Sequence, residues 1–442
     1  MIDDRDDRAR TPAHDLALSC IEAGIDAARP ERVVRESLTV EGDQLRIDDA
    51  VIDLGAFERA VALGGGKAAA HVAAALETVL GDRLDGGVVV TDDPVETDRV
   101  AVREGDHPVP SERGVSGARA VRAAAADADA DTLVLAVLTG GGSALLPAPA
   151  DGLSLSALRR VTEALLEAGA PIEAVNAVRK HCSAIKGGRL ARAAAPATVH
   201  TLLFSDVVGD DPAVIASGPT VPDPTTFGDA RAVLDEYDVD APEAVRERIE
   251  RGVAGGIDET PTADDPAFER VRTHVLANGR TAVDAARNAA ADEGVETLVL
   301  AAGVEGEARE VAKAHAAVAR EIRETGDPVA PPAVVCSGGE TTVTVAGDGR
   351  GGPNCEFALS AARSLPPDTV LAAVDTDGRD GESGAAGAVV DAETIEDDRA
   401  AGRALAANDA ATFLDEREAL LRTGRTGTNV NDLHVLVVPD RE

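Results

Sequence analysis

The stretch that most constrains this chain is Thr132–Pro147, where a wholly apolar segment leads into consecutive glycines. Leu133–Leu138 has the length of a strand and no polar residue, which is typical of a strand covered on both faces of a parallel α/β sheet. Gly140-Gly141-Gly142-Ser143 follow, and residues without a Cβ let backbone N–H groups approach an anion. Ligands of open α/β sheets sit beyond the carboxyl ends of the strands. This loop is therefore predicted to form one wall of a phosphate-binding site.

The composition limits the classes of protein to consider. A chain of 442 residues is long enough for two domains, each with its own core. The formal net charge is -36, and acidic residues are scattered along the whole chain. A nucleic-acid-binding protein needs a basic face, so no nucleic-acid partner is expected. Scattered acid with arginine preferred to lysine and few aromatics is similar to the proteins of salt-adapted organisms, in which salt screens the repulsion.

Cysteine usage and hydropathy indicate where such a chain resides. The four cysteines show no CxxC spacing, which favours reduced thiols in a cytoplasmic protein. The amino terminus is acidic and lacks the apolar core of a signal peptide. No run of about 20 apolar residues is present, so no membrane partner is expected.

Lysine is scarce, and its positions are informative. The chain contains Lys67, Lys180, Lys186 and Lys313, and arginine supplies the other positive side chains. A compact ammonium fits a crowded anion pocket in which a guanidinium is too wide. Lys313 lies in an ordinary helical pattern and is assigned to the surface, whereas the other three lysines lie near glycines.

Gly64-Gly65-Gly66-Lys67 forms a second glycine-rich turn between a strand and a helix. It does not fit the Walker A pattern, because Ala68 replaces the Ser/Thr that would hold magnesium. Gly64-x-Gly66-x-x-Ala69 fits the loose dinucleotide fingerprint, and a tight turn without a ligand is the structural alternative. Because lysine is so rare here, Lys67 favours a phosphate or carboxylate role.

Two further segments contain candidate functional residues. Asn176–Ala194 gathers cations in an acidic chain, which indicates an anionic ligand, although helix cations paired with nearby acids would give the same pattern. His107, beside Pro108, is assigned to a loop rather than to a ligand role. Asp206 directly follows the apolar strand Thr198–Phe204 and could hold Mg²⁺ or accept the proton of a hydroxyl group.

A composition shift at about 235–270 marks the expected domain boundary, with domains at 1–240 and 241–442. The second half shows a new α/β series, in which Ala333–Cys336 is a strand leading into Ser337-Gly338-Gly339-Glu340. A second aspartate loop, Asp375–Gly381, lacks the later acidic ligand of an EF-hand.

The order of these motifs resembles the glycerate 2-kinase family, whose carboxy-terminal part is the MOFRL domain. The resemblance covers nearly the whole chain. It rests on GGGKA at 64–68, TGGGSALL at 139–146, VRKHCSAIKGGRLA at 178–191, SDVVGDDPAVIASGPTVPDPTT at 205–226, SGGETTVTV at 337–345, the loop 375–387 and TGTNVNDL at 426–433.

The resemblance implies ATP-dependent phosphorylation of D-glycerate at its 2-hydroxyl, with Mg²⁺. It implies a larger Rossmann-like α/β/α domain, a smaller α/β domain with the MOFRL region at about 333–438, and a cleft between them; a homodimer is left open. Lys67 and Asp206 are then the expected catalytic residues, and Ser143, Arg179 and Lys180 are expected to bind glycerate. The expected phosphate or nucleotide ligands are Gly65, Gly66, Gly140, Gly141, Gly142, Lys186, Gly338, Gly339, Glu340 and Arg425, and the expected metal ligands are Asp210 and Asp377.

Two departures from the family pattern concern one cation. Pro353 stands where the family commonly has an arginine, and Arg425 stands where it often has proline. Arg425 or Arg350 is therefore expected to supply the missing positive charge.

Two other functions compete with this interpretation. A hydroxypyruvate reductase using NAD(P)H would draw on the loose fingerprint at Gly64 and need a general acid such as His181. A sugar-acid sensor without catalysis is the third candidate, and the density of glycine, lysine and aspartate at strand ends argues against it.

Overall fold

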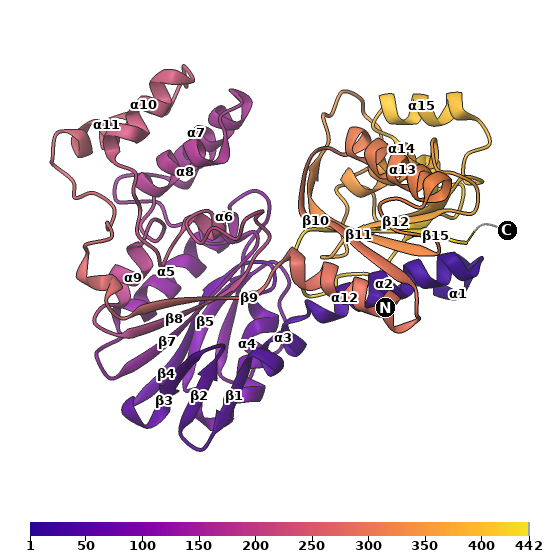
Figure 1. The fold of residues 1–442 in the computed structure, drawn as a ribbon. Helices are drawn as coiled ribbons and strands as arrows, with labels where there is room; N and C mark the ends of the chain where they lie inside the picture. The colour runs from indigo at the N-terminus through magenta and orange to yellow at the C-terminus, as the bar shows by residue number, and fades with distance from the viewer. Residues whose placement is uncertain (441–442) are drawn as a thin grey trace. The chain divides into compact units, whose positions relative to one another are not determined.

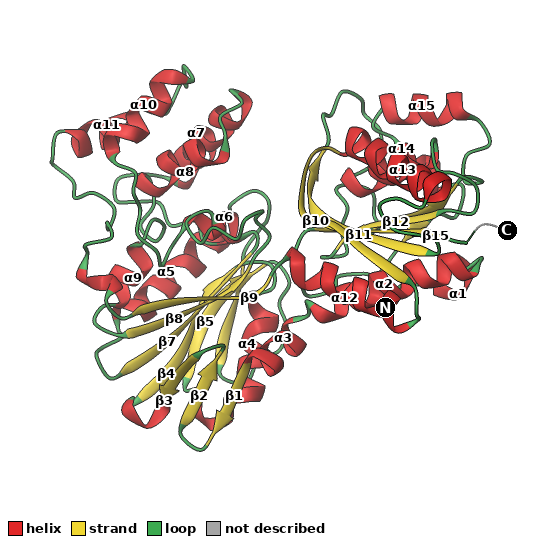
Figure 2. Ribbon diagram, viewed as in Figure 1, coloured by secondary structure: helices red, strands yellow, loops and turns green. Residues whose placement is uncertain are grey.

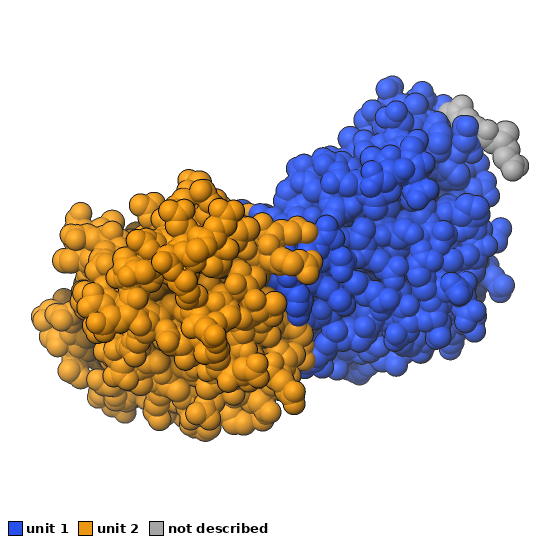
Figure 3. All heavy atoms as spheres, turned by 90° about the horizontal axis from the view of Figure 1, so that it is seen from below, with its two compact units in different colours: residues 1–32, 206–209, 277–442 blue, residues 33–205, 210–276 orange. Residues whose placement is uncertain are grey.

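A computed structural model of the chain describes residues 1–440, which divide into two compact units (Figure 3). Unit 2 contains residues 33–205 and 210–276, and unit 1 contains residues 1–32, 206–209 and 277–442. The two-domain α/β organisation is confirmed, but the boundary predicted at residue 240 is wrong. Strand β9 (Val271–Ala277), which lies beyond that boundary, is an edge strand of the first sheet.

The sheet of unit 2 has the strand order β6-β5-β4-β7-β8-β9. Its other strands are β4 (Arg59–Gly65), β5 (Gly86–Thr91), β6 (Val100–Glu104), β7 (Thr132–Thr139) and β8 (Thr198–Phe204). From β6 to β8 every neighbouring pair is parallel. Every residue of β7 is buried, so the apolar strand predicted at 133–138 is confirmed as the covered centre of a parallel sheet.

Helices lie on both sides of this sheet (Figure 2). They are α3 (Pro30–Ser37), α4 (Ala69–Leu80), α5 (Glu112–Ala126), α6 (Gly142–Leu145) and α9 (Arg189–Ala194). A small antiparallel sheet of β1 (Leu38–Glu41), β2 (Gln44–Ile47) and β3 (Ala50–Asp53) accompanies them. In chain order the parallel strands are arranged 3-2-1-4-5, the Rossmann arrangement, in which the order reverses between the first and fourth strands. Here these strands are β4 and β7, and each ends in one of the two glycine-rich turns.

Four helices of unit 2 form a lobe with a core of its own (Figure 1). They are α7 (Leu155–Glu167), α8 (Ile172–His181), α10 (Phe227–Glu236) and α11 (Glu243–Val253). Val178 and Cys182 from the α8 segment pack with Phe227 and Leu234 of α10 in this core. Ser154 accepts a hydrogen bond from the Ala157 amide and caps α7.

Unit 1 is built on a mixed sheet with the order β10-β11-β15-β12-β13-β14. Its strands are β10 (Glu296–Glu307), β11 (Ala333–Thr342), β12 (Val370–Asp375), β13 (Gly387–Asp391), β14 (Leu420–Leu421) and β15 (Asp432–Val438). Its helices are α1 (Arg5–Arg8), α2 (Pro12–Ala27), α12 (Gly279–Asp292), α13 (Ala308–Thr325), α14 (Pro353–Ala362), α15 (Asp398–Ala406) and α16 (Ala410–Asp415). Only β10 and β11 pair in parallel, and the neighbouring pairs that follow are antiparallel.

The amino-terminal arm belongs to unit 1, although the sequence placed it in the first domain. Helix α2 packs against α12 and β15, and a Cβ on Gly24 would lie 2.4 Å from Leu433. Apolar residues at helical spacing predict that this helix buries a face, but they do not say against which sheet.

Candidate functional site

The two glycine-rich turns of unit 2 meet where the strand order reverses. The Lys67 amide donates to the Gly140 carbonyl over 2.8 Å, and the Ala68 amide donates to Thr139 Oγ1 over 3.1 Å. A Cβ on Gly66 would lie 2.1 Å from Thr139 Oγ1, so only glycine allows this approach. The Gly66 amide is also used, because it donates to the Val90 carbonyl. The absence of side chains at 64–66 thus serves the packing of β4 on β7, and this turn does not offer the Gly66 and Lys67 amides to an anion.

Lys67 and His107 flank the second turn. A Cβ built on Gly141 would lie 3.0 Å from His107 Cδ2 and 3.0 Å from Lys67 Cγ. Gly141 has φ = 76°, a conformation that favours glycine. Two basic side chains therefore pack on one bare stretch of backbone.

Beside this turn lies a cavity of about 380 Å³ within unit 2. Gly141, Ser143 and Ala144 form one wall, and the loop 107–110 lies along another. Helix α7 contributes Leu158, Arg159 and Glu163, among others. The remaining polar lining comes from the segment at and after the end of α8, where Arg179, Ser183 and Lys186 lie. This volume is within the range of pockets that hold small-molecule ligands, about 300–1,000 Å³.

Arg179 and Lys186 bring positive charge into the cavity without a counter-ion. The Lys186 side chain is 3% exposed, and its Nζ donates to the Ala216 carbonyl over 3.2 Å. Arg179 Nη1 donates to Asn176 Oδ1 over 3.1 Å. Burial, and then the nearby Arg179, hold the pKa of Lys186 well below its ordinary value, and burial lowers the pKa of Arg179. Within residues 1–440, neither cation has a carboxylate partner, so an anionic ligand is the group that would satisfy them.

A chain of hydrogen bonds joins Ser143 to Arg179. Ser143 Oγ lies 2.9 Å from Ser217 Oγ, and Ser217 Oγ donates to Asn176 Oδ1 over 3.0 Å. Asn176 is buried, and its Oδ1 accepts from both Ser217 and Arg179, while its Nδ2 has no hydrogen-bond partner. One amide thus links the loop after β7 to the guanidinium on α8.

The turn at 216–218 is held in an unusual conformation. Ala216, Ser217 and Gly218 have φ values of 51°, 61° and 63°. For residues other than glycine this region costs energy and persists where the surroundings enforce it, often at functional sites. The turn presents the Ala216 carbonyl to Lys186 and the Ser217 hydroxyl to Ser143.

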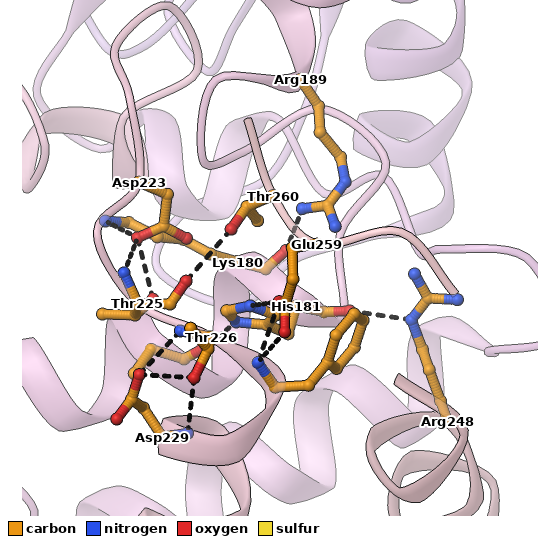
Figure 4. Close-up of polar contacts among 12 residues, drawn as sticks. Lys180, His181, Arg189, Asp223, Thr225, Thr226, Asp229, Arg248, Glu259 and Thr260 are labelled. Atoms are coloured by element: carbon orange, nitrogen blue, oxygen red, sulfur yellow. Dashed lines mark hydrogen bonds and ion pairs between the residues drawn. The ribbon is translucent and has the colours of Figure 1, made fainter. Parts of the chain in front are cut away.

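Lys180 is engaged differently from the sequence expectation. Its Nζ forms an ion pair with Asp223 over 3.3 Å, and both side chains are buried (Figure 4). Asp223 also accepts hydrogen bonds from the Thr225 amide and hydroxyl. Lys180 is not among the residues lining the cavity, so its geometry favours a structural role rather than glycerate binding.

Two arginines complete the carboxyl end of α8 (Figure 4). Arg189 donates to the Lys180 carbonyl over 2.8 Å, and Arg248 donates to the His181 carbonyl over 2.8 Å. Cations at this end of a helix stabilise its dipole. His181 itself contacts Glu259 and the edge of Phe227, inside the lobe. Part of the basic segment at 176–194 therefore stabilises the helix that carries Arg179.

Unit 1 holds Asp206 against the segment before β15. Asp206 Oδ2 accepts from Asn429 Nδ2 over 3.2 Å, and the Asp206 carbonyl accepts from Asn431 Nδ2. Thr376 Oγ1 donates to the Asn431 carbonyl, which places the turn after β12 beside the same segment. Asp377 accepts a hydrogen bond from the Arg379 amide. Asp210 belongs to unit 2, and its backbone φ is 55°. In residues 1–440 no group of three or more His, Cys, Asp or Glu side chains could hold a metal ion.

The strand predicted at 333–336 is longer than expected, because β11 continues to Thr342, pairing with β10 along this length and with β15 as far as Gly339. A Cβ on Gly339 would lie 2.0 Å from the Val304 carbonyl oxygen, so the glycine serves strand pairing. Gly338 faces the Asp432 carbonyl in the same way, and Glu340 is exposed.

The two arginines expected to supply the missing positive charge lie on the surface of unit 1. Arg350 pairs with Asp415 over 2.9 Å, and Arg425 is exposed. Pro353 begins α14, where a missing N–H is tolerated. Lys313 pairs with Glu310 on the surface, as predicted.

Sequence reasoning missed Asn176, Ser217 and the position of His107. Asn176 and Ser217 carry no charge, and their functional position depends on a hydrogen-bond chain between segments about forty residues apart. A His-Pro dipeptide in a turn-rich segment gave no signal for a place beside Lys67.

Comparison with family models identifies both halves of the chain. A domain of unknown function, DUF4147, matches residues 16–250, and the MOFRL family matches residues 333–432. A glycerate 2-kinase from Pyrococcus horikoshii is 38% identical over 97% of this chain and 98% of its own length. The chain belongs to the glycerate kinase family.

Two other relatives are similar to this chain over most of its length. The crystal structure of a glycerate kinase from Thermotoga maritima has a TM-score of 0.83 and 36% identity, and covers 96% of this chain and 98% of that one. A protein from Agrobacterium vitis, provisionally named a hydroxypyruvate reductase, is 44% identical over 86% of this chain and 87% of its own length. No helix among residues 1–440 is long and apolar enough to cross a bilayer.

Proposed function

We propose that this member of the glycerate kinase family transfers a phosphoryl group from ATP to the 2-hydroxyl of D-glycerate, giving 2-phosphoglycerate. The observation that carries the proposal is that two cations, the buried Lys186 and the half-buried Arg179, reach a cavity without a carboxylate partner among residues 1–440. A small carboxylic acid is the class of ligand that supplies the missing charge. The kinase names of the relatives supply the reaction.

The carboxylate of glycerate would bind at Arg179 and Lys186, with Ser143 donating to it or to a neighbouring hydroxyl. A guanidinium offers a fork of donors suited to a carboxylate, and Lys186 adds a point charge. The chain from Ser143 through Ser217 to Asn176 would hold these donors in place before the substrate arrives.

Lys67 would stabilise the charge on the phosphoryl group as it moves. Phosphoryl transfer depends mostly on positioning and electrostatics, so an ammonium beside the bare backbone of Gly141 suits the task. Gly140, Gly141 and Gly142 keep their proposed place at the phosphates.

A magnesium ion would neutralise the nucleotide phosphates when bound. Mg²⁺ is usually held by one or two carboxylates together with phosphate oxygens and water, and not by a protein cage. A single carboxylate oriented by a neighbouring amide, as Asp206 is by Asn429, suits that mode. Asp206, oriented by Asn429, is the ligand we propose, and Asp377 and Asp210 remain secondary candidates.

The reductase alternative rests on the names of two relatives from Agrobacterium vitis and on the glycine fingerprint. In that fingerprint the backbone of the turn approaches a pyrophosphate. Here the Gly66 and Lys67 amides donate to protein carbonyls, and the Cβ position of Gly66 is filled by Thr139. This geometry favours the kinase.

The test is to incubate the protein with D-glycerate, ATP and Mg²⁺ in concentrated salt and to locate the product phosphate by ³¹P NMR. Phosphate on the 2-oxygen is expected. A parallel incubation with hydroxypyruvate and NADH, followed by absorbance at the nicotinamide band, should give no turnover. Reduction without phosphorylation would replace the proposal with its alternative.

A further inference from the structure

His107 is a cavity-lining side chain beside the glycine-rich turn that follows β7. It belongs to the turn between β6 and α5, lines the cavity, and packs on Gly141 together with the aliphatic part of Lys67. Gly141 and Ser143 line the same cavity as Arg179 and Lys186. His107 therefore lines the same cavity as the two cations, and it also packs beside Lys67 on Gly141.

We infer that His107 is the general base of the reaction, which rests on the proposed kinase function. The lone pair of an imidazole nitrogen takes the proton of the 2-hydroxyl. The hydroxyl oxygen forms a bond to the γ-phosphorus of ATP, and the bond from that phosphorus to the β,γ-bridging oxygen breaks. ADP leaves with the electron pair of that bond, and the imidazolium returns its proton to water.

The other titratable groups of the cavity are less suited to this task. Arg159 and Arg179 stay protonated at any ordinary pH. Lys186 is committed to the Ala216 carbonyl and to the anion. Glu163 is exposed on α7 and, unlike His107, is not among the atoms nearest to Gly141. An imidazole changes its charge near neutral pH and is the side chain most often used as a general base.

The charged groups near His107 include Lys67, two side chains of α7, and the neighbouring Asp106 with its partner Arg113. Lys67, on the turn between β4 and α4, packs beside it on Gly141. Arg159 of α7 donates to the Pro110 carbonyl in the loop of His107, and Glu163 lies one turn further along α7 in the same cavity. These groups have to be kept unchanged when the pH dependence is compared between variants.

The experiment compares His107→Gln and His107→Asn with wild type and with His71→Gln. His71 lies in the same unit, pairs with Asp93 over 3.3 Å and does not line the cavity, so its variant is the matched control. For both His107 variants we expect kcat to fall about 100-fold to 10,000-fold, with KM for glycerate within about threefold of wild type. The acid limb of the wild-type profile of kcat/KM against pH should disappear. His71→Gln should keep wild-type rates and the acid limb.

Three results would overturn the inference while leaving the proposed function intact. The first is a variant with kcat within about threefold of wild type. The second is a raised KM for glycerate with unchanged kcat, which would make His107 a binding residue. The third needs no variant: a wild-type profile without an acid limb in the range of histidine ionisation. A wild-type protein that does not phosphorylate glycerate would overturn the proposed function, and the inference with it.

Discussion

Lys180 and Lys186 lie on the same short segment of an acidic chain, and both are buried, yet their surroundings differ. Lys180 faces Asp223 in an ion pair, whereas Lys186 reaches a carbonyl oxygen and the wall of a cavity. A buried charge with a partner is part of the fold. A buried charge without one is costly unless a ligand completes it. The comparison separates a structural lysine from a candidate binding lysine, although both were singled out by the same scarcity in the sequence.

The largest expected effect is on stability and concerns the structural lysine, Lys180. Lys180→Met leaves Asp223 buried without its cation, which typically costs about 3–5 kcal/mol of stability. We expect the free energy of unfolding to fall by that amount in denaturant titrations in concentrated salt, with KM for glycerate near wild type for the folded fraction. The double variant Lys180→Met/Asp223→Leu should recover part of the loss. A stable Lys180→Met protein with a strongly raised KM for glycerate would instead show that Lys180 binds the substrate.

Lys186→Met tests whether the second lysine binds the substrate. Loss of a buried, charged partner of a ligand costs about 2–4 kcal/mol, so KM for glycerate should rise about 30-fold to 1,000-fold. Because the pKa of Lys186 is lowered in the folded state, its charge opposes folding at neutral pH and ceases to do so only above the unfolded pKa. The variant should therefore unfold at the same temperature as wild type or higher. A raised KM for ATP instead of glycerate would restore the phosphate role expected from the sequence.

Asp432 extends the comparison to a buried acid without a cation. It accepts hydrogen bonds from Thr341 and Asn354, and burial raises its pKa to about 7. The folded state then binds more protons than the unfolded state between about pH 4 and pH 7, so this group makes stability fall as pH rises through that window. Asp432→Asn should reduce this change in the free energy of unfolding by about 4 kcal/mol over the window, as measured in denaturant titrations at several pH values. An unchanged slope would mean that Asp432 is ionised throughout.

The smallest effect concerns the surface arginines. If Arg425 replaces the arginine lost at Pro353, Arg425→Ala should raise KM for ATP about threefold to tenfold, the cost of about 1 kcal/mol for an exposed charged contact. Arg350→Ala tests the other candidate in the same way. Arg363→Ala, which removes a surface pair with Asp398, is the matched control and should change KM by less than twofold. Unchanged kcat and KM in Arg425→Ala would exclude this arginine.

The sequence predicted the parallel sheet of unit 2 well because its strands are buried on both faces and therefore apolar throughout. β7 and β8 lie where the sequence placed them, and the turns after β4 and β7 flank the point at which the strand order reverses. The division into units was less predictable. Helix α2 shows a periodic apolar face, but its partners α12 and β15 lie more than 250 residues away in the chain.

The residues by themselves determined the fold class, the family and a short set of candidate cations, since apolar runs, glycine-rich turns and the rarity of lysine are properties of the chain. Only the tertiary structure decided which cation has a carboxylate beside it. It also placed His107 next to Lys67, assigned Gly339 to a strand, and joined Ser143 to Arg179 through Asn176. The physical reason is that the cost or benefit of a buried charge depends on the neighbours that distant segments bring to it, and local sequence patterns do not specify those neighbours.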